Sequence, residues 1–170
     1  LHLHDWQASL MAVYLKTLYQ EKSFYNRIHS LLTIHNIGYQ GIFAKEKFSK
    51  LGLENKIFDI NGVEFYGKIN LLKGGIIFSD FINTVSPTYA KEIQTEEFGF
   101  GLEGLLRERK NVLSGILNGV DYSVWDPGTD TFITHNFSVG YMENKVLNKE
   151  NLQKICGLSV NKDIPVLGMV

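Results

Sequence analysis

Two short segments place polar, chemically active side chains directly after predicted strands. Asp5-Trp6-Gln7 follows the short strand Leu1-His-Leu-His4, and His35-Asn36 follows the apolar run Leu31-Leu-Thr-Ile. An apolar run with β-branched residues that ends in a polar, glycine-containing segment is typical of a buried strand and the loop that leaves it. In a parallel sheet, such loops lie at the carboxyl ends of the strands, where open α/β sheets bind their ligands.

The loop after the second run carries four candidate site residues, His35, Asn36, Tyr39 and Gln40. A neutral imidazole donates a hydrogen bond with one ring nitrogen and accepts with the other, so His35 could orient a hydroxyl group without a full charge beside it. On this stretch alone, a satisfied histidine at a strand end followed by a turn is an equally good interpretation. Asn36, Tyr39 and Gln40 could brace the loop as readily as contact a ligand.

Asp5 stands at a predicted junction between a strand and a helix. Apolar residues from Trp6 to Leu18 recur at three- and four-residue spacing, which predicts a helix over residues 6–20 with one apolar face. An Asp before a helix is a favoured N-cap worth about 1 kcal/mol, and from the residue alone capping is the better interpretation. Trp6 falls on the apolar stripe and is expected to be a core aromatic residue.

The order of the predicted elements indicates an α/β fold, a Rossmann-like parallel sheet with flanking helices. Strands are expected at about residues 1–4, 31–35, 80–85, 112–117 and 164–170. Helices are expected near residues 6–20, 70–79, 87–94, 101–110 and 143–157, and a short charged helix near 43–53 interrupts the alternation. Asn118-Gly119 and Asp126-Pro-Gly128 are turn signals.

Several other features are expected to be structural. Gly74-Gly75 predicts close helix packing, Lys73 a solvated helix residue, and Ser86-Pro87 a cap followed by the first helical position. His2 and His4 alternate along a strand and would share a face, but no third metal ligand stands at a suggestive spacing, so we expect no metal site.

Composition excludes some partners. Seventeen Lys and Arg residues nearly balance eighteen Asp and Glu residues, so no strong field would attract nucleic acid or an anionic membrane. No apolar run approaches the roughly 20 residues that a membrane helix needs. The single Cys156 cannot form an internal disulfide. The sequence starts and ends inside strand-like runs, from which we expect it to be an internal piece of a longer protein.

Six motifs, in order along nearly the whole chain, resemble those of the bacterial glycogen synthases and plant starch synthases. Gln7 and Ser9 depart from the usual residues of the first motif. The six segments are His4-Asp-Trp, Thr33-Ile-His-Asn-Ile-Gly-Tyr-Gln-Gly41, Glu64-Phe-Tyr-Gly-Lys-Ile-Asn-Leu-Leu-Lys-Gly-Gly75, Asn83-Thr-Val-Ser-Pro-Thr-Tyr89, Phe98-Gly-Phe-Gly-Leu-Glu-Gly104 and Gly115-Ile-Leu-Asn-Gly-Val-Asp121.

The resemblance implies a two-domain GT-B glycosyltransferase. Residues 1–117 would be the later half of the N-terminal Rossmann-like domain, 118–142 the crossover, and 143–170 the first helix and strand of the C-terminal domain. The implied activity is retaining transfer of glucose from ADP-glucose to the nonreducing end of an α-1,4-glucan, with no cofactor. The implied location is the cytoplasm of a bacterium, or the plastid for a plant enzyme.

The resemblance also assigns roles to individual residues. His35 and Asp5 would be the catalytic residues, and Asn118, Asn36, Tyr39 and Gln40 would bind the glucosyl substrate. Family motifs for the diphosphate do not occur in this sequence, so we expect the 170 residues alone to be inactive. We also expect them to self-associate, through the exposed edge of the strand at residues 1–4 or through the apolar run 164–170. Alternatives are a noncatalytic module with weak glucan binding, or another GT-B enzyme such as sucrose synthase or phosphorylase, which the second and sixth motifs disfavour.

Overall fold

The computed structural model describes residues 1–169 and divides the chain into two compact units, one of Leu1–Asn118 and one that begins at Gly119. The first unit contains a four-stranded sheet with the order β1-β2-β6-β7 in which every pair of neighbours is parallel. Its strands are β1 (His2–His4), β2 (Leu31–Ile34), β6 (Phe81–Thr84) and β7 (Leu113–Gly115). The expected parallel sheet is confirmed, and each strand lies within a few residues of its predicted position.

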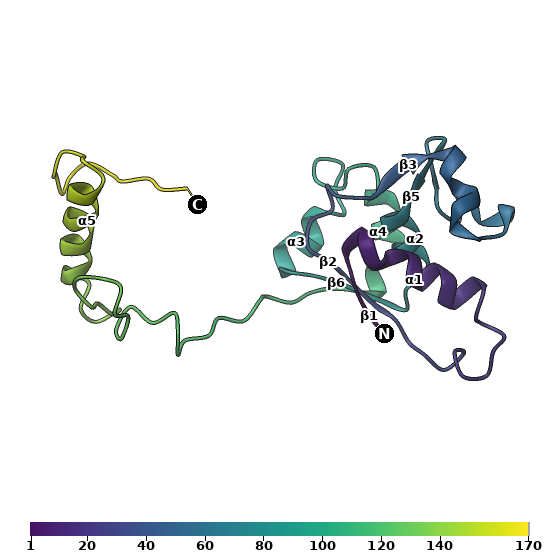
Figure 1. Ribbon diagram of the computed structural model, residues 1–170, viewed down its shortest axis with the longest axis horizontal. Coiled ribbons are helices and arrows are strands. Elements are labelled where there is room, and N and C mark those ends of the chain that lie inside the picture. Colours follow the sequence, from purple (N-terminus) through teal and green to yellow (C-terminus); the bar gives the residue numbers. More distant parts are fainter. Residues whose placement is uncertain (170) are drawn as a thin grey trace. The chain divides into compact units, whose positions relative to one another are not determined.

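Helices pack against this sheet and enclose the main core (Figure 1). They are α1 (Asp5–Thr17), α2 (Leu71–Phe78), α3 (Pro87–Glu92) and α4 (Glu103–Glu108), followed by the short 3₁₀ helix η3 (Lys110–Val112). Strand residues such as Leu32 and Ile82 meet Ala12 of α1 and Ile76 of α2 in this core. The flanking helices expected from the sequence are therefore confirmed.

Close packing of α1 on α2 depends on the paired glycines. A Cβ atom added at Gly75 would lie 2.4 Å from Ser9 Oγ of α1, and one at Gly74 would lie 3.0 Å from Val13 Cγ2 of α1. The predicted role of Gly74-Gly75 is thus confirmed. Ser86 caps α3 as expected, because its side chain accepts hydrogen bonds from the backbone of Thr88 and Tyr89, and Pro87 follows at the start of the helix.

A second, antiparallel sheet with the order β3-β5-β4 was not predicted. Its strands are β3 (Ile42–Ala44), β4 (Glu64–Phe65) and β5 (Lys68–Asn70), and the 3₁₀ helices η1 (Lys45–Leu51) and η2 (Asn55–Ile57) lie between the first two. The helix expected over 43–53 is therefore a 3₁₀ helix preceded by a strand. A second core under this layer gathers Val13 of α1 with apolar residues of the small sheet, such as Ile69.

Lys73 corrects the expectation of a solvated residue. Its side chain is buried, and Nζ donates hydrogen bonds to the carbonyl oxygens of Ile60 at 2.6 Å and Glu64 at 2.5 Å. Burial lowers the pKa of Lys73, and the nearby carboxylates of Glu64 and Asp59 oppose that shift. The reason is that α2 is covered on nearly every side, since residues 71–76 are all buried.

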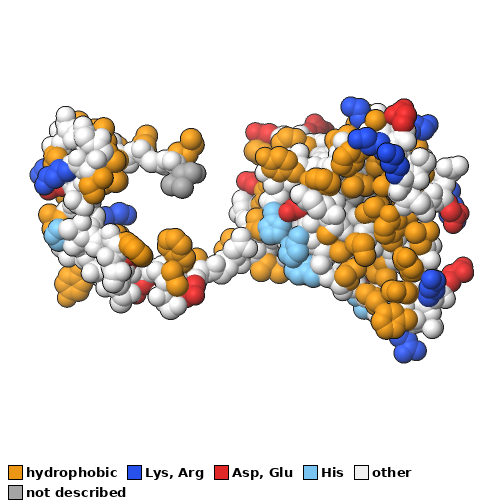
Figure 2. Space-filling view, in the orientation of Figure 1, with side chains coloured by type: hydrophobic (Ala, Val, Ile, Leu, Met, Phe, Trp, Pro, Cys, Tyr) orange, Lys and Arg blue, Asp and Glu red, His pale blue; other side chains and the backbone are white. Residues whose placement is uncertain are grey.

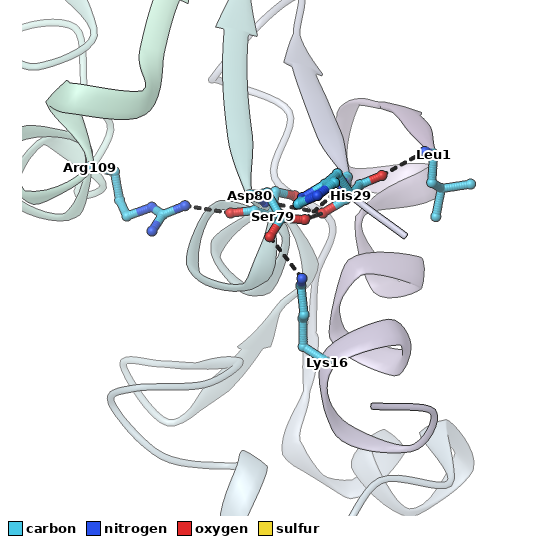
Figure 3. Close-up of polar contacts among 7 residues, drawn as sticks. Leu1, Lys16, His29, Ser79, Asp80 and Arg109 are labelled. Atoms are coloured by element: carbon cyan, nitrogen blue, oxygen red, sulfur yellow. Dashed lines mark hydrogen bonds and ion pairs between the residues drawn. The ribbon is translucent and has the colours of Figure 1, made fainter. Parts of the chain in front are cut away.

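Polar groups tie the amino ends of β2 and β6 together (Figure 3). Asp80 accepts hydrogen bonds from Lys16 Nζ at 2.8 Å and from the backbone N–H of Ser30 at 2.7 Å. Arg109 donates to the carbonyl oxygen of Ser79 beside it. Burial alone would raise the pKa of Asp80, but the hydrogen bonds from Lys16 and Ser30 outweigh it and lower that pKa.

The second unit contains α5 (Glu143–Ile155) and irregular chain on both sides of it. The strand expected over 164–170 is wrong for the described residues 164–169, which form no strand and pair with no other segment. An apolar run needs a neighbouring strand to become part of a sheet, and Leu167 and Met169 are instead almost fully exposed. Of the helices within residues 1–169, none has the length and apolar character needed to cross a membrane.

Candidate functional site

The carboxyl ends of β1 and β2 bring the two chemically active segments together. β1 pairs with β2 in the register His4 with Thr33, so the residues that follow each strand emerge side by side. Helix α1 begins at once after β1, whereas β2 leads into a loop. The histidines of this region, His2, His4 and His35, are exposed, and Figure 2 shows histidine side chains gathered on the surface of the first unit next to an acidic side chain.

Asp5 does not cap α1, which corrects the sequence interpretation. It is the first residue of the helix, His4 occupies the cap position, and no side chain caps the helix there. The Asp5 carboxylate instead accepts a hydrogen bond from the backbone N–H of His35 at 2.7 Å. Its φ of 51° lies in the left-handed region, which costs conformational energy and which Asp tolerates better than most residues. The fold therefore holds Asp5 in a strained position against the loop of β2.

His35 is held by two contacts. Its backbone is fixed by Asp5, and its ring nitrogen Nε2 lies 3.1 Å from Nδ1 of His4, within hydrogen-bond distance. A hydrogen bond from a neighbour selects the tautomer and orientation of an imidazole. The other ring nitrogen of His35 has no hydrogen-bond partner among residues 1–169 and can contact a ligand.

A second series of polar contacts starts from β1 and crosses the sheet to β6. Nε2 of His2 lies 2.7 Å from the hydroxyl group of Thr33, which donates to Asn83 Oδ1 at 2.5 Å. The rings of His2 and His4 are 4.2 Å apart. No group of three His, Cys, Asp or Glu side chains in the part of the chain that the structure describes is arranged to hold a metal ion.

The polar residues in the loop after β2 are of two kinds. Some hold the loop in place through hydrogen bonds, and others are exposed. Asn36 accepts a hydrogen bond from the backbone N–H of Gly38 at 2.9 Å, while Tyr39 is 68% exposed. Gln40 is buried, accepts from Asn70 Nδ2 at 2.6 Å, and donates to the carbonyl oxygen of Phe100 at 3.2 Å. Gln40 thus ties the loop to the start of α2, and its amide is not aimed at open space.

A hollow of about 420 Å³ lies at these strand ends and is lined by Asp5, Trp6, Gln7, Asn36 and Tyr39. Trp6 packs against both apolar cores as expected, and it also lines this hollow. Gly41, with a φ of 64°, makes room for that ring, because an added Cβ would lie 2.4 Å from Trp6 Cε3. Carboxylate, amide, phenol and indole groups in one hollow suit a ligand with hydroxyl groups and apolar faces.

Asn118 is separate from this cluster within the first unit. It is exposed, follows β7 by three residues, and is the last residue of that unit. Within residues 1–169 it makes no side-chain hydrogen bond with the residues around His35. The structure therefore brings Asp5, His35, Asn36 and Tyr39 together and leaves Asn118 at the boundary between the two units.

Sequence reasoning missed three residues of this site. His4 contacts the ring of His35, and Trp6 and Gln7 line the hollow. The signal for His4 was its position at the end of a predicted strand, next to Asp5. Its contact with His35 depends on the register between β1 and β2, which the sequence does not specify.

Comparisons with known proteins agree with one another. The starch synthase catalytic domain family matches residues 1–108. The glycogen synthase of Thermosipho melanesiensis is 55% identical over the whole chain, and that of Pseudothermotoga lettingae is 53% identical over 99% of it; each match covers 35% of the relative. The chain thus spans about a third of the length of these relatives.

A solved structure is also similar to this chain. The catalytic domain of starch synthase IV from Arabidopsis thaliana, bound to ADP and acarbose, matches 93% of this chain with a TM-score of 0.77 and 36% sequence identity. The match covers 33% of that structure's chain.

Proposed function

This chain belongs to the starch synthase catalytic domain family, and we propose that the complete protein transfers glucose from ADP-glucose to the nonreducing end of an α-1,4-glucan with retention of configuration. Support comes from relatives named glycogen synthase that are more than half identical over nearly the whole chain. The similar starch synthase structure contains ADP and acarbose, which fits a nucleotide-sugar donor and a glucan acceptor.

The observation that carries the proposal is the contact between Asp5 and the loop of His35 at the carboxyl edge of the sheet. Retaining glucosyl transfer passes through an oxocarbenium-like state. Preorganised dipoles directed at such developing charge are each worth about 10²–10³ in rate. His35, oriented by His4 and exposed on its other side, would contact the glucosyl unit during transfer.

The other candidate residues have binding roles in this proposal. The Asp5 carboxylate would accept hydrogen bonds from sugar hydroxyls through the oxygen that His35 does not use. Asn36 and Tyr39 would contact the substrate from the wall of the hollow, and Gln40 would act through the position of the loop. Asn118 would reach the glucosyl unit from the boundary between the domains.

We extend the proposal to the organisation of the complete protein. Residues 1–117 would belong to the N-terminal domain of a GT-B enzyme, 118–142 to the crossover, and 143–170 to the start of the C-terminal domain. No cofactor is required for this transfer. The two glycogen synthases named above come from bacteria, which supports a bacterial cytoplasmic enzyme, and a plastid would be the location of a plant enzyme.

The 170 residues alone would be inactive, because the groups that would bind the diphosphate lie outside them. Removing even one stabiliser of this kind costs about 2.7–4 kcal/mol of transition-state binding. The competing function is a noncatalytic module that binds glucan weakly, and the aromatic wall of the hollow is the observation in its favour.

The experiment measures incorporation of labelled glucose from ADP-glucose into glycogen by the complete protein and by the 170-residue chain. We expect transfer by the complete protein, α-configured product in the NMR spectrum, and none above a blank for the shorter chain. UDP-glucose tested in parallel determines donor preference. A complete protein that binds maltoheptaose but transfers no glucose would favour the noncatalytic module.

A further inference from the structure

Two exposed aromatic residues adopt a backbone conformation that normally belongs to glycine. Tyr66 has a φ of 48° and Phe100 a φ of 51°, and each is followed by a glycine that also has a positive φ. Apart from Asp5, they are the only non-glycine residues with positive φ in residues 1–169. For a bulky residue such a φ is a genuine outlier, and strained residues of this kind cluster at functional sites.

Tyr66 occupies a position for which other residues are better suited. Phe65 pairs with Lys68 across β4 and β5, so Tyr66 and Gly67 form a two-residue hairpin loop. Two positive φ values in such a loop are those of a type I′ turn, where Asn-Gly is the preferred pair. Tyr66 is nevertheless 83% exposed, so the ring contributes little to the packing of the protein.

The two strained pairs pack against each other. A Cβ atom added at Gly101 would lie 2.9 Å from Phe65 Cζ and 3.9 Å from Tyr66 Cε2. The ring of Phe65 meets that of Tyr66 edge to face, with centroids 4.7 Å apart. The close approach of the Phe100-Gly101 turn to the hairpin depends on the absence of a side chain at Gly101.

Phe100 also connects this surface to the candidate site. Its ring lies 3.8 Å from a Cβ atom added at Gly38, in the loop that follows His35, and its carbonyl oxygen accepts the hydrogen bond from Gln40. Phe100 is 61% exposed. An aromatic surface therefore leads from the loop of His35, through Phe100, to Tyr66 at the hairpin.

Beside Tyr66 the surface opens into a hollow of about 700 Å³ lined by both apolar and polar groups. Asn61, Glu64, Glu108 and Arg109 contribute polar groups to it, and Phe65 and Tyr66 contribute apolar rings. Arg109 Nε is buried without a hydrogen-bond partner among residues 1–169. Aromatic faces next to amide and carboxylate groups match the alternating apolar faces and hydroxyl edges of a glucose chain.

We propose that Tyr66 and Phe100 form a glucan subsite outside the His35 site, on which successive glucose units of the acceptor stack. The identity of the ligand as an α-1,4-glucan rests on the proposed function. The strained backbone holds both rings outward. Neither side chain therefore has to rearrange from a buried position when the glucan binds. The subsite would contribute to affinity for long acceptors and not to the transfer step.

The test uses the complete protein with Tyr66→Gly and Phe100→Gly, compared with Tyr66→Phe and Phe100→Tyr. Glycine removes the ring and accepts a positive φ without strain, so thermal stability should stay the same or rise. Maltoheptaose affinity measured by calorimetry should fall about threefold to tenfold for each glycine variant, the range of one aromatic contact. The aromatic replacements should keep near-normal affinity, and kcat at saturating acceptor should change little in all four variants.

Unchanged maltoheptaose affinity in both glycine variants would overturn the subsite, as would an equal loss in the aromatic replacements. A loss of affinity accompanied by a lower melting temperature would assign these rings to structure and overturn it too. Wild-type protein that binds maltoheptaose through these rings but transfers no glucose would leave the subsite standing and contradict the proposed function. Glucose transfer by the wild type, with unchanged maltoheptaose affinity in the glycine variants, would support the proposed function and overturn the subsite.

Discussion

At the scale of single residues, Asp5 has two requirements that few side chains meet together. Its backbone lies in the left-handed region, and its carboxylate accepts a hydrogen bond from the backbone N–H of His35, which follows the neighbouring strand. Asn and Asp are the non-glycine residues that adopt this backbone most readily. An amide oxygen at this position could also accept the same hydrogen bond, whereas a methyl group could not.

We therefore predict that Asp5→Asn in the complete protein folds normally but loses about tenfold in turnover, since a charge-assisted hydrogen bond to a sugar hydroxyl is roughly twice as strong as a neutral one. Asp5→Ala should lose turnover and also about 1–2 kcal/mol of stability, because the backbone N–H of His35 would lose its partner. Thermal denaturation and initial rates measure the two effects. Equal stability of the Asn and Ala variants would contradict the structural role of Asp5.

At the scale of elements, the two ends of the parallel strands, which form the amino edge and the carboxyl edge of the sheet, carry different groups. The carboxyl edge carries the exposed His35 and the hollow, while the amino edge is tied by Asp80 to Lys16 and Ser30. These ties connect α1, β2 and β6, the elements that position the site. The amino edge thus contributes rigidity to a site it does not touch.

Stability should depend on pH through Asp80. Its pKa is lower in the folded protein than the ordinary value of 3.8, so its stabilising contribution is present above that value and is lost as the pH falls through the lower, folded value. We predict that Asp80→Asn costs about 1–3 kcal/mol near neutral pH and flattens the decline in stability at acidic pH. Urea denaturation from neutral to acidic pH measures this, with Glu46→Gln, an exposed carboxylate, as the control. Parallel pH curves for the wild type and Asp80→Asn would contradict the prediction.

The elements also show where sequence patterns suffice. The parallel strands and α2 were predictable, because each is an apolar run bounded by turn or cap residues such as Asn70 and Ser86. The small sheet was not, since β4 has only two residues and its pairing with β5 depends on the turn at Tyr66-Gly67. Lys73 was misassigned because burial of a whole helix is set by packing from both layers, and charge alone does not reveal it.

The same limit applies to the site. The residue types of His35, Asn36 and Tyr39 marked the loop, but Asp5 was interpreted as a cap because an Asp before a helix has that role most often. Its contact with His35 joins residues 30 positions apart and follows from strand order and register. Sequence reasoning therefore located the site and did not provide its internal contacts.

At the scale of the whole molecule, β1 is an edge strand, because among residues 1–169 it pairs with β2 alone. An exposed parallel strand presents unpaired N–H and C=O groups that can template pairing with a second copy. The apolar residues Ile164, Leu167 and Met169 are exposed as well. We predict that the 170-residue chain self-associates at high concentration through one of these segments. Light scattering of this chain and of a version without residues 164–170 tests this, and a strict monomer in both would contradict it.

The central claim is that the complete protein is a glucosyltransferase whose sugar site is organised around His35. The most direct measurement compares turnover and ADP affinity of the complete wild-type protein with those of His35→Ala, with His29→Ala as the matched control in an exposed segment at the opposite edge of the sheet. We predict that His35→Ala lowers turnover by about 10²–10³, while ADP affinity and His29→Ala stay close to wild type. Near-full turnover of His35→Ala, or a loss confined to ADP affinity, would contradict the account.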